Sequence, residues 1–203
     1  MEFIILATTH FLALLSPGPD FFLIMQASIR MKLRYAVSIC GGISFANGVY
    51  LLCAILGIET IKSNQTIMQL LQYGGALYLI FLGVMLLKIK KNQEIELPKS
   101  KLFLHVESIP RQFFIGFLSG ILNPKNMLFY FSIFTVLVSE QTLFSTKVLY
   151  ALWMVAIVFS WDCLVAMLFG KNSLKKYFER SIYYIEKITG LALVLFGSSL
   201  IFF

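Results

Sequence analysis

The chain has 203 residues, of which 59% are hydrophobic and only 13% are charged, a balance far outside the composition of soluble proteins. It excludes an ordinary soluble domain, because apolar stretches long enough to cross a membrane occupy most of the chain. The net charge of +7 does not indicate nucleic-acid binding, because the basic residues stand in short runs between the apolar stretches.

Six apolar runs predict six transmembrane helices and hence an all-α membrane protein. Each run is long enough to cross about 30 Å of hydrocarbon. A barrel is not indicated, because its strands would alternate apolar and polar residues over about ten positions. The predicted spans cover residues 4–27, 36–58, 67–88, 112–138, 147–169 and 182–203.

The basic residues between the spans predict the orientation of the chain, since cytoplasmic loops carry an excess of Lys and Arg. The second and fourth loops hold only Lys62 and Lys147. Both termini are therefore predicted to face outward, and the odd-numbered loops to face the cytoplasm. The first, third and fifth loops hold fourteen of the 17 basic residues, namely Arg30, Lys32, Arg34, Lys88, Lys90, Lys91, Lys99, Lys101, Arg111, Lys171, Lys175, Lys176, Arg180 and Lys187.

The longest and most polar stretch, residues 89–111, divides a single transmembrane domain of residues 1–203 into two halves of three spans. Repeat 1 covers residues 1–88 and repeat 2 covers residues 112–203. Because each half crosses the membrane an odd number of times, a second copy of the same unit inserts upside down. The sequence therefore predicts two inverted three-helix repeats.

Proline interrupts the first span of each half, which are the first and fourth predicted helices. Proline removes a backbone donor and clashes with the preceding turn, so Pro17 and Pro19 around Gly18 are expected to open the helix near mid-membrane. Paired breaks in matching spans indicate the binding site of a transporter, whereas a single break can equally be a simple kink. The two segments read Ser16-Pro17-Gly18-Pro19-Asp20 and Asn123-Pro124-Lys125.

Three ionisable residues, Asp20, Lys125 and Asp162, lie within the spans. Each costs about 2.5 to 3.5 kcal/mol at a helix centre on insertion scales, so pairing or hydration is required. Asp20 and Lys125 carry opposite charges. Two interpretations stay open: the charges offset each other structurally, or they form a gate or substrate site whose pairing changes during transport. A position of Asp20 near the cytoplasmic end also stays open, because Arg30 follows closely.

Asp162 is the better candidate for a group that binds and releases a proton, because its predicted span offers no basic residue to neutralise it beyond Lys147, which is counted with the preceding loop. The alternative is a carboxyl group that stays protonated or bonds to a neighbouring helix. Gln26, Ser44, Asn47 and Asn126 can complete a polar lining, although such side chains more often join helices to one another.

No metal site, disulfide bond or cofactor is expected. His10 and His105 have no second histidine or carboxylate at metal-ligand spacing. Cys40, Cys53 and Cys163 lie inside apolar runs and form no CxxC motif.

The proline segments at residues 16–20 and 123–125, together with the glycine-bounded segment 75–83, resemble those of the LysE/RhtB family of bacterial amino-acid exporters. The resemblance runs the full length of the chain. It implies a secondary transporter that exports amino acids or close derivatives across the bacterial inner membrane, coupled to proton or ion exchange. The family's motifs carry over to Pro17, Gly18, Pro19, Asn123, Pro124 and Lys125, whereas Asp162 lies outside them.

The expected partners are an amino acid or related small molecule, a coupling proton or ion, membrane lipid and, as an open possibility, further copies of the chain. A membrane carrier of thiols or electrons is a second class, but it needs a reactive cysteine pair at the breaks. An enzyme is not expected, because no serine or cysteine has a plausible base nearby. A transporter of another small solute and an ion channel stay open, and the paired breaks favour a carrier.

Overall fold

The computed structural model describes residues 1–16, 18–61, 65–88, 107–139, 141–170 and 175–202, and these parts of the chain form eight helices and no strand. The prediction of an all-α protein is therefore confirmed for the described residues. The helices are α1 (Glu2–Leu15), α2 (Pro19–Arg30), α3 (Leu33–Ile61), α4 (Gln65–Lys88), α5 (Ile109–Ile121), α6 (Pro124–Leu137), α7 (Phe144–Phe169) and α8 (Lys175–Phe202).

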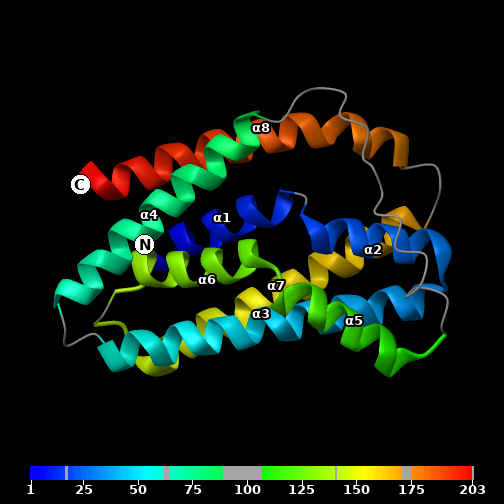
Figure 1. Ribbon diagram of the computed structural model, residues 1–203, viewed down its shortest axis with the longest axis horizontal. Helices are drawn as coiled ribbons and strands as arrows, with labels where there is room; N and C mark the ends of the chain where they lie inside the picture. The colour runs from blue at the N-terminus through cyan, green and yellow to red at the C-terminus, as the bar shows by residue number, and fades with distance from the viewer. Residues whose placement is uncertain (17, 62–64, 89–106, 140, 171–174, 203) are drawn as a thin grey trace.

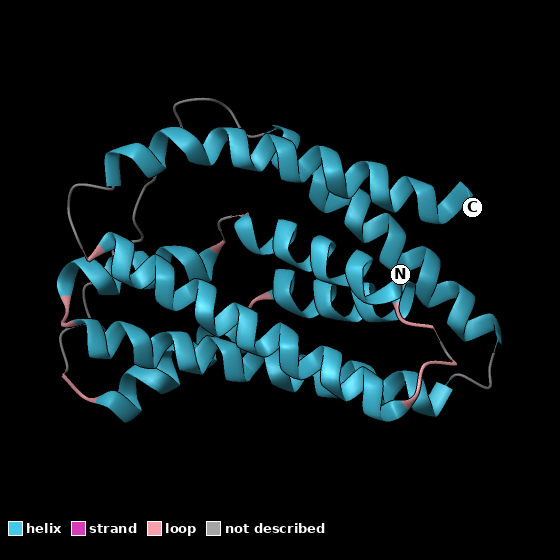
Figure 2. Cartoon of the chain, turned by 180° about the vertical axis from the view of Figure 1, so that it is seen from behind, coloured by secondary structure: helices cyan, strands magenta, loops and turns pink. Residues whose placement is uncertain are grey.

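The helices run back and forth between two ends of the molecule, with α1 followed by α2 and α5 followed by α6 in the same direction (Figure 1). Both chain termini lie at the same end, as Figure 2 also shows from behind. The predicted spans correspond to α1 with α2, α3, α4, α5 with α6, α7 and α8. Most of these helices begin a few residues before the predicted spans.

Within the described residues, two helices are long and apolar enough to cross a membrane alone, α3 over Leu33–Gly57 and α7 over Phe144–Phe169. A third span results if α1 and α2, which meet at an angle of 56°, count as one broken helix. Tyr73–Lys88 and Lys125–Leu137 are shorter apolar helices. The prediction that Lys147 belongs to the fourth loop is wrong, because this residue lies near the start of α7 and is buried.

The helices pack as two groups, which contact each other mainly through α3 and α6, and each proline break joins one group to the other. The α3 group consists of α2, α3, α5 and α7, in which α3 packs most extensively on α5 and α7. The α4 group consists of α1, α4, α6 and α8, in which α4 packs most extensively on α8 and α6. α1 and α2 therefore belong to different groups although they are consecutive, and so do α5 and α6.

Glycines bring helices into backbone contact within each group. A Cβ atom at Gly42 of α3 would overlap the carbonyl oxygen of Phe113 of α5 and lie 2.6 Å from the Phe117 nitrogen. In the other group, a Cβ at Gly83 of α4 would lie 2.6 Å from the carbonyl oxygen of Gly190 of α8. Small residues allow membrane helices to approach this closely, so each group is a tightly packed body.

Gly42→Ala is expected to destabilise the protein, by about 1 to 3 kcal/mol or more, because the new methyl group meets backbone atoms that cannot rotate away. Gly57→Ala on the same helix is the matched control, since a Cβ there meets nothing within 4 Å. The measurement is the temperature at which the detergent-solubilised protein aggregates. Equal transition temperatures for the two variants would contradict the close packing of α3 on α5.

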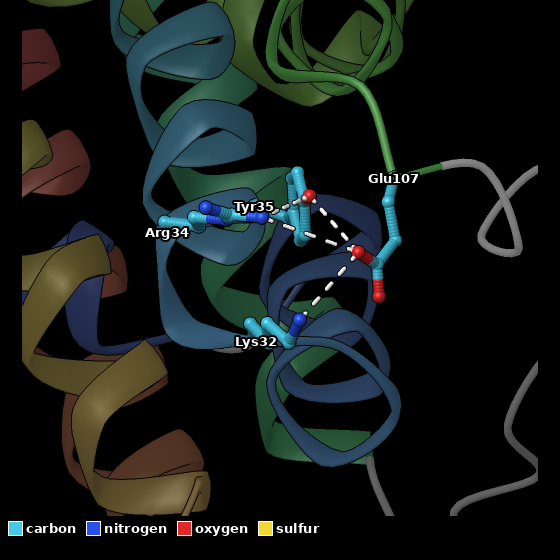
Figure 3. A network of polar contacts seen from close by, with 4 residues as sticks. All are labelled: Lys32, Arg34, Tyr35 and Glu107. Atoms are coloured by element: carbon cyan, nitrogen blue, oxygen red, sulfur yellow. Dashed lines mark hydrogen bonds and ion pairs between the residues drawn. The ribbon is translucent and has the colours of Figure 1, made fainter.

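A polar network joins the start of α3 to the residues just before α5 (Figure 3). The Glu107 carboxylate lies 3.7 Å from Lys32 Nζ and 4.0 Å from Arg34 Nη2, and it accepts a hydrogen bond of 3.2 Å from the Tyr35 hydroxyl. The Arg34 guanidinium stacks on the Tyr35 ring, 4.7 Å from its centroid. More than half of the Glu107 side chain is exposed, so each pair contributes only about 0 to 1 kcal/mol.

Candidate functional site

The two breaks come together in the middle of the molecule. α1 ends at Leu15, and α2 begins with Gly18 as its N-cap and Pro19 in its first turn. α6 begins at Pro124, where the Asn123 side chain accepts a hydrogen bond of 3.0 Å from the Lys125 amide. Pro17 lies outside the described residues. Each break thus presents the carboxyl end of one helix and the amino end of the next.

The carboxylate of Asp20 connects the two breaks. Its Oδ1 accepts a hydrogen bond of 2.5 Å from the Ser119 hydroxyl on α5. Its Oδ2 accepts bonds of 2.9 Å from Asn123 Nδ2 and 2.7 Å from Asn126 Nδ2. Asn126 Nδ2 also donates to Asn47 Oδ1 on α3 at 3.1 Å. Helices α2, α5 and α6 therefore meet at one acidic side chain, and Asn126 links it to α3. Asp20 lies beside the breaks and not among the basic residues at the helix ends.

Lys125 lies at the same point but does not pair directly with Asp20. Its Nζ donates to the carbonyl oxygen of Ser16 at 3.1 Å and to the Ser16 hydroxyl at 3.2 Å. Among the described residues, the ion pairs involve Glu107 and neither of these two. The two charges therefore form no direct ion pair in this conformation, and both interpretations of their proximity stay predictions.

A cavity of about 70 Å³ lies between the breaks. Its polar lining comes from both breaks and from α1, α3 and α7, and aromatic rings of α2, α6 and α7 also line it. Gln26 and Ser44, two predicted lining residues, are buried but do not contribute. The lining residues are His10, Ala13, Leu14, Ser16, Gly18, Asp20, Phe21, Ile43, Asn47, Asn123, Lys125, Asn126, Phe129, Tyr130, Val158, Trp161 and Asp162.

Asp162 reaches this cavity from α7. Its side chain is 7% exposed, and its Oδ2 has no hydrogen-bond partner among the described residues. A buried polar atom without a partner is unfavourable by about 1 to 3 kcal/mol, and by more for a charged group. The carboxyl group is thus available to a proton, a cation or a donor that enters the cavity.

Sequence reasoning missed three polar residues of the site. Ser119 bonds to Asp20, Ser16 bonds to Lys125, and His10 lines the cavity with 1% of its surface exposed. Ser16 opens the first proline segment, which was an available signal, whereas nothing distinguishes Ser119 from the serines that commonly link membrane helices. His10 had one available signal, since a histidine in an apolar span is unusual.

The site can hold a small solute with charges of both signs. Helix amino ends favour anions and helix carboxyl ends favour cations, and the breaks bring both kinds of end together. None of the three cysteines lines the cavity. Within the described residues, no group of three His, Cys, Asp or Glu side chains is placed to bind a metal ion.

Comparison with known proteins gives a family match over nearly the whole chain. The model of the family described as LysE type translocator matches residues 11–202. The chain is 28% identical to a threonine efflux protein of Escherichia coli K12, over 99% of this chain and 98% of that protein. It is 26% identical to a threonine efflux protein of Salmonella typhi with the same coverage, and 29% identical to the uncharacterized membrane protein YrhP of Bacillus subtilis, over 89% of each chain. No solved structure matches.

Proposed function

Because the chain belongs to the LysE type translocator family, a family of transporters and not of enzymes, we propose that it exports amino acids or close derivatives across the bacterial inner membrane. The resemblance drawn from the proline motifs is confirmed at the level of the family. Relatives of full-length coverage bear the name threonine efflux protein, which makes threonine the first amino acid to test.

One observation carries the proposal. Two proline breaks, separated by more than a hundred residues of sequence, converge on one cavity that holds a buried carboxyl, an ammonium group and several amides. A zwitterionic amino acid needs a cation for its carboxylate and acceptors for its ammonium group. Lys125 supplies the first, while Asp20 and Asp162 supply the second.

The proposed topology is six spans in two inverted three-helix repeats, one before and one after residues 89–111. The broken helices α1 with α2 and α5 with α6 are then equivalent, as are α3 with α7 and α4 with α8. Both termini face the outside. This orientation follows from the basic loops and agrees with the position of both termini at one end of the molecule (Figure 1).

Alternating access follows from the two packing groups. The α3 and α4 groups are held together internally by glycine contacts, and the cavity lies between them. In the described part of the chain, the hydrogen bonds that cross from one group to the other include those from Asn126 to Asp20 and from Asn126 to Asn47. We expect the groups to rock about the breaks, so that these bonds open when the cavity faces one side of the membrane.

Exchange of a proton is the proposed driving reaction, with Asp162 as the first proton acceptor and Asp20 as the second. Asp162 has an oxygen without a partner, so it can accept a proton without breaking an existing hydrogen bond. The Asp20 oxygens already accept bonds from three donors. Protonation of Asp20 would therefore disturb the network that joins the two groups.

Efflux from cells loaded with dipeptides tests the proposal. Cells that lack their own amino-acid exporters would express the protein or a variant with Lys125→Ala at matched levels. Faster release of one or more amino acids, lost in the variant, is the expected result. If well-expressed protein releases no amino acid from any dipeptide, the proposed function is wrong, and a transporter of another solute becomes the better hypothesis.

A further inference from the structure

Glu186 is a buried carboxyl group that the proposed transport mechanism does not use. It lies near the middle of α8, with 5% of its surface exposed. Its Oε2 has no hydrogen-bond partner among the described residues. An ionisable group inside a membrane helix is unfavourable unless it is paired or hydrated, so a nearby cation is the partner to look for.

The packing of α8 on α1 places Glu186 level with the first proline break. The Thr189 hydroxyl donates a hydrogen bond of 3.2 Å to the carbonyl oxygen of Leu12 on α1. Because both chain termini lie at one end of the molecule, α1 and α8 are antiparallel (Figure 1). Three residues back along α8 and four residues forward along α1 are therefore steps in the same direction, of about 4.5 and 6 Å. Glu186 thus lies at the level of Ser16, on the face of α8 that carries Thr189.

Lys125 is the cation at that level. Its Nζ donates to the carbonyl oxygen and the hydroxyl of Ser16, and its charge interacts electrostatically with the carboxyl groups of Asp20 and Glu186. Asp20 already accepts hydrogen bonds from three neutral donors, whereas Oε2 of Glu186 accepts none within the described part of the chain. Of the two carboxyl groups that act on Lys125, Glu186 therefore has an acceptor still available.

Glu186 acts on Lys125 from outside the cavity. Lys125, Ser16 and Asp20 line the cavity, and Glu186 is not among the lining residues. A substrate carboxylate that binds in the cavity and the Glu186 carboxylate therefore attract the same ammonium group from different directions. Since like charges repel each other, each of the two carboxylates weakens the hold of Lys125 on the other.

We propose that Glu186 is a positioning residue for substrate release, which competes with the carboxylate of the bound amino acid for the ammonium group of Lys125. This inference rests on the proposed function, in which Lys125 binds that carboxylate, and adds the step by which the substrate leaves. A buried ammonium group without a competing anion would hold its carboxylate for longer, because affinity is gained mostly through slower dissociation. The return of Lys125 to Ser16 restores the arrangement of the substrate-free site.

Exchange kinetics of Glu186→Gln test the proposal. Purified protein is reconstituted with unlabelled threonine inside, and the initial uptake of labelled threonine is measured over a range of external concentrations. If another amino acid is exchanged faster by the wild type, it replaces threonine. The glutamine keeps the size of the side chain and removes the competing charge, so the KM and the maximal rate are both expected to fall, by roughly three- to tenfold.

Two variants serve as controls for the kinetics. Glu186→Asp keeps the charge and is expected to stay close to the wild type in both parameters. Glu107→Gln makes the same carboxylate-to-amide change at an exposed network away from the cavity, and it is expected to leave both unchanged. A lower maximal rate without a lower KM in Glu186→Gln would overturn the release role, because a purely structural defect does not tighten substrate binding. Wild-type kinetics in this variant would overturn it as well.

A double-mutant cycle in detergent tests the interaction itself, without any substrate. The temperature at which the solubilised protein aggregates is measured for Lys125→Met, Glu186→Gln and the double variant. Removing either partner alone leaves the other charge buried without it, so the two single losses are expected to sum to more than the loss in the double variant. Additive losses would overturn the proposal whatever the transport assays show. If the wild type exchanges no amino acid, the proposed function fails and the release role fails with it, while the cycle still reports whether the two side chains interact.

Discussion

Asp20→Asn is expected to reduce amino-acid transport at least roughly tenfold while the protein stays folded. The asparagine keeps one oxygen for the amides of Asn123 and Asn126, and its own amide can donate to Ser119, whose hydroxyl both donates and accepts. The geometry is therefore preserved while the negative charge is lost. The measurement is initial transport rate in proteoliposomes, together with thermal stability in detergent.

Two further variants distinguish the effect of losing the Asp20 charge from the effect of losing its hydrogen bonds. Asp20→Ala leaves three donors without an acceptor and is expected to lower stability as well, by about 1 to 3 kcal/mol per buried group. Glu107→Gln makes the same carboxylate-to-amide change at an exposed network away from the cavity, and it is expected to transport normally. Undiminished transport by Asp20→Asn would contradict a role for this carboxylate in the transport cycle.

Asp162→Asn is expected to uncouple amino-acid transport from the proton gradient. If Asp162 carries the coupled proton, the asparagine variant cannot accumulate substrate in response to an imposed pH gradient. Exchange of internal for external substrate, which needs no net proton movement, is expected to continue. Both rates are measured on the same proteoliposomes, with and without the gradient.

Cys163→Ser provides the control for Asp162→Asn, because it changes the adjacent residue of α7 and leaves the carboxyl group in place. Accumulation driven by the pH gradient in Asp162→Asn, at the wild-type level, would remove Asp162 from the coupling mechanism and leave Asp20 as the remaining acidic group of the cavity.

The paired breaks could be predicted from the sequence because proline acts locally. Its missing N–H group and fixed φ angle interrupt the interior of a helix but suit its first turn, so the segments around Pro19 and Pro124 mark the starts of α2 and α6 without any knowledge of packing. The same holds for the helices, whose apolar runs are long and continuous. Helix ends depend on capping and on neighbouring segments of the chain, so the sequence predicts them less well, and α8 begins at Lys175 where the predicted span begins at residue 182.

The partners of the buried charges could not be predicted, because they depend on how helices are rotated against each other. Opposite charges suggested that Asp20 pairs with Lys125, yet neutral groups satisfy each of them, three donors for Asp20 and Ser16 for Lys125. The packing of α5 against α2 brings Ser119 to Asp20. A single sequence does not show which residues of two packed helices face each other.

Lys147 illustrates the same limit at a helix end. The positive-inside rule treats each basic residue as a solvated loop charge, but Lys147 is buried near the start of α7. The proposed orientation rests on many basic residues at once, and one buried lysine does not reverse their excess in the odd-numbered loops. Individual burial follows from tertiary packing and has no local signal.

Exchange of labelled amino acids across proteoliposomes that contain only the purified protein tests the central claim most directly. Vesicles are loaded with a mixture of unlabelled amino acids, and the uptake of each labelled amino acid is followed without any ion gradient. Uptake of at least one small amino acid, abolished in Lys125→Ala and retained in Glu107→Gln, is the predicted result. Uptake that is absent for every amino acid, or equal in the two variants, would contradict a translocator whose substrate passes between the two proline breaks.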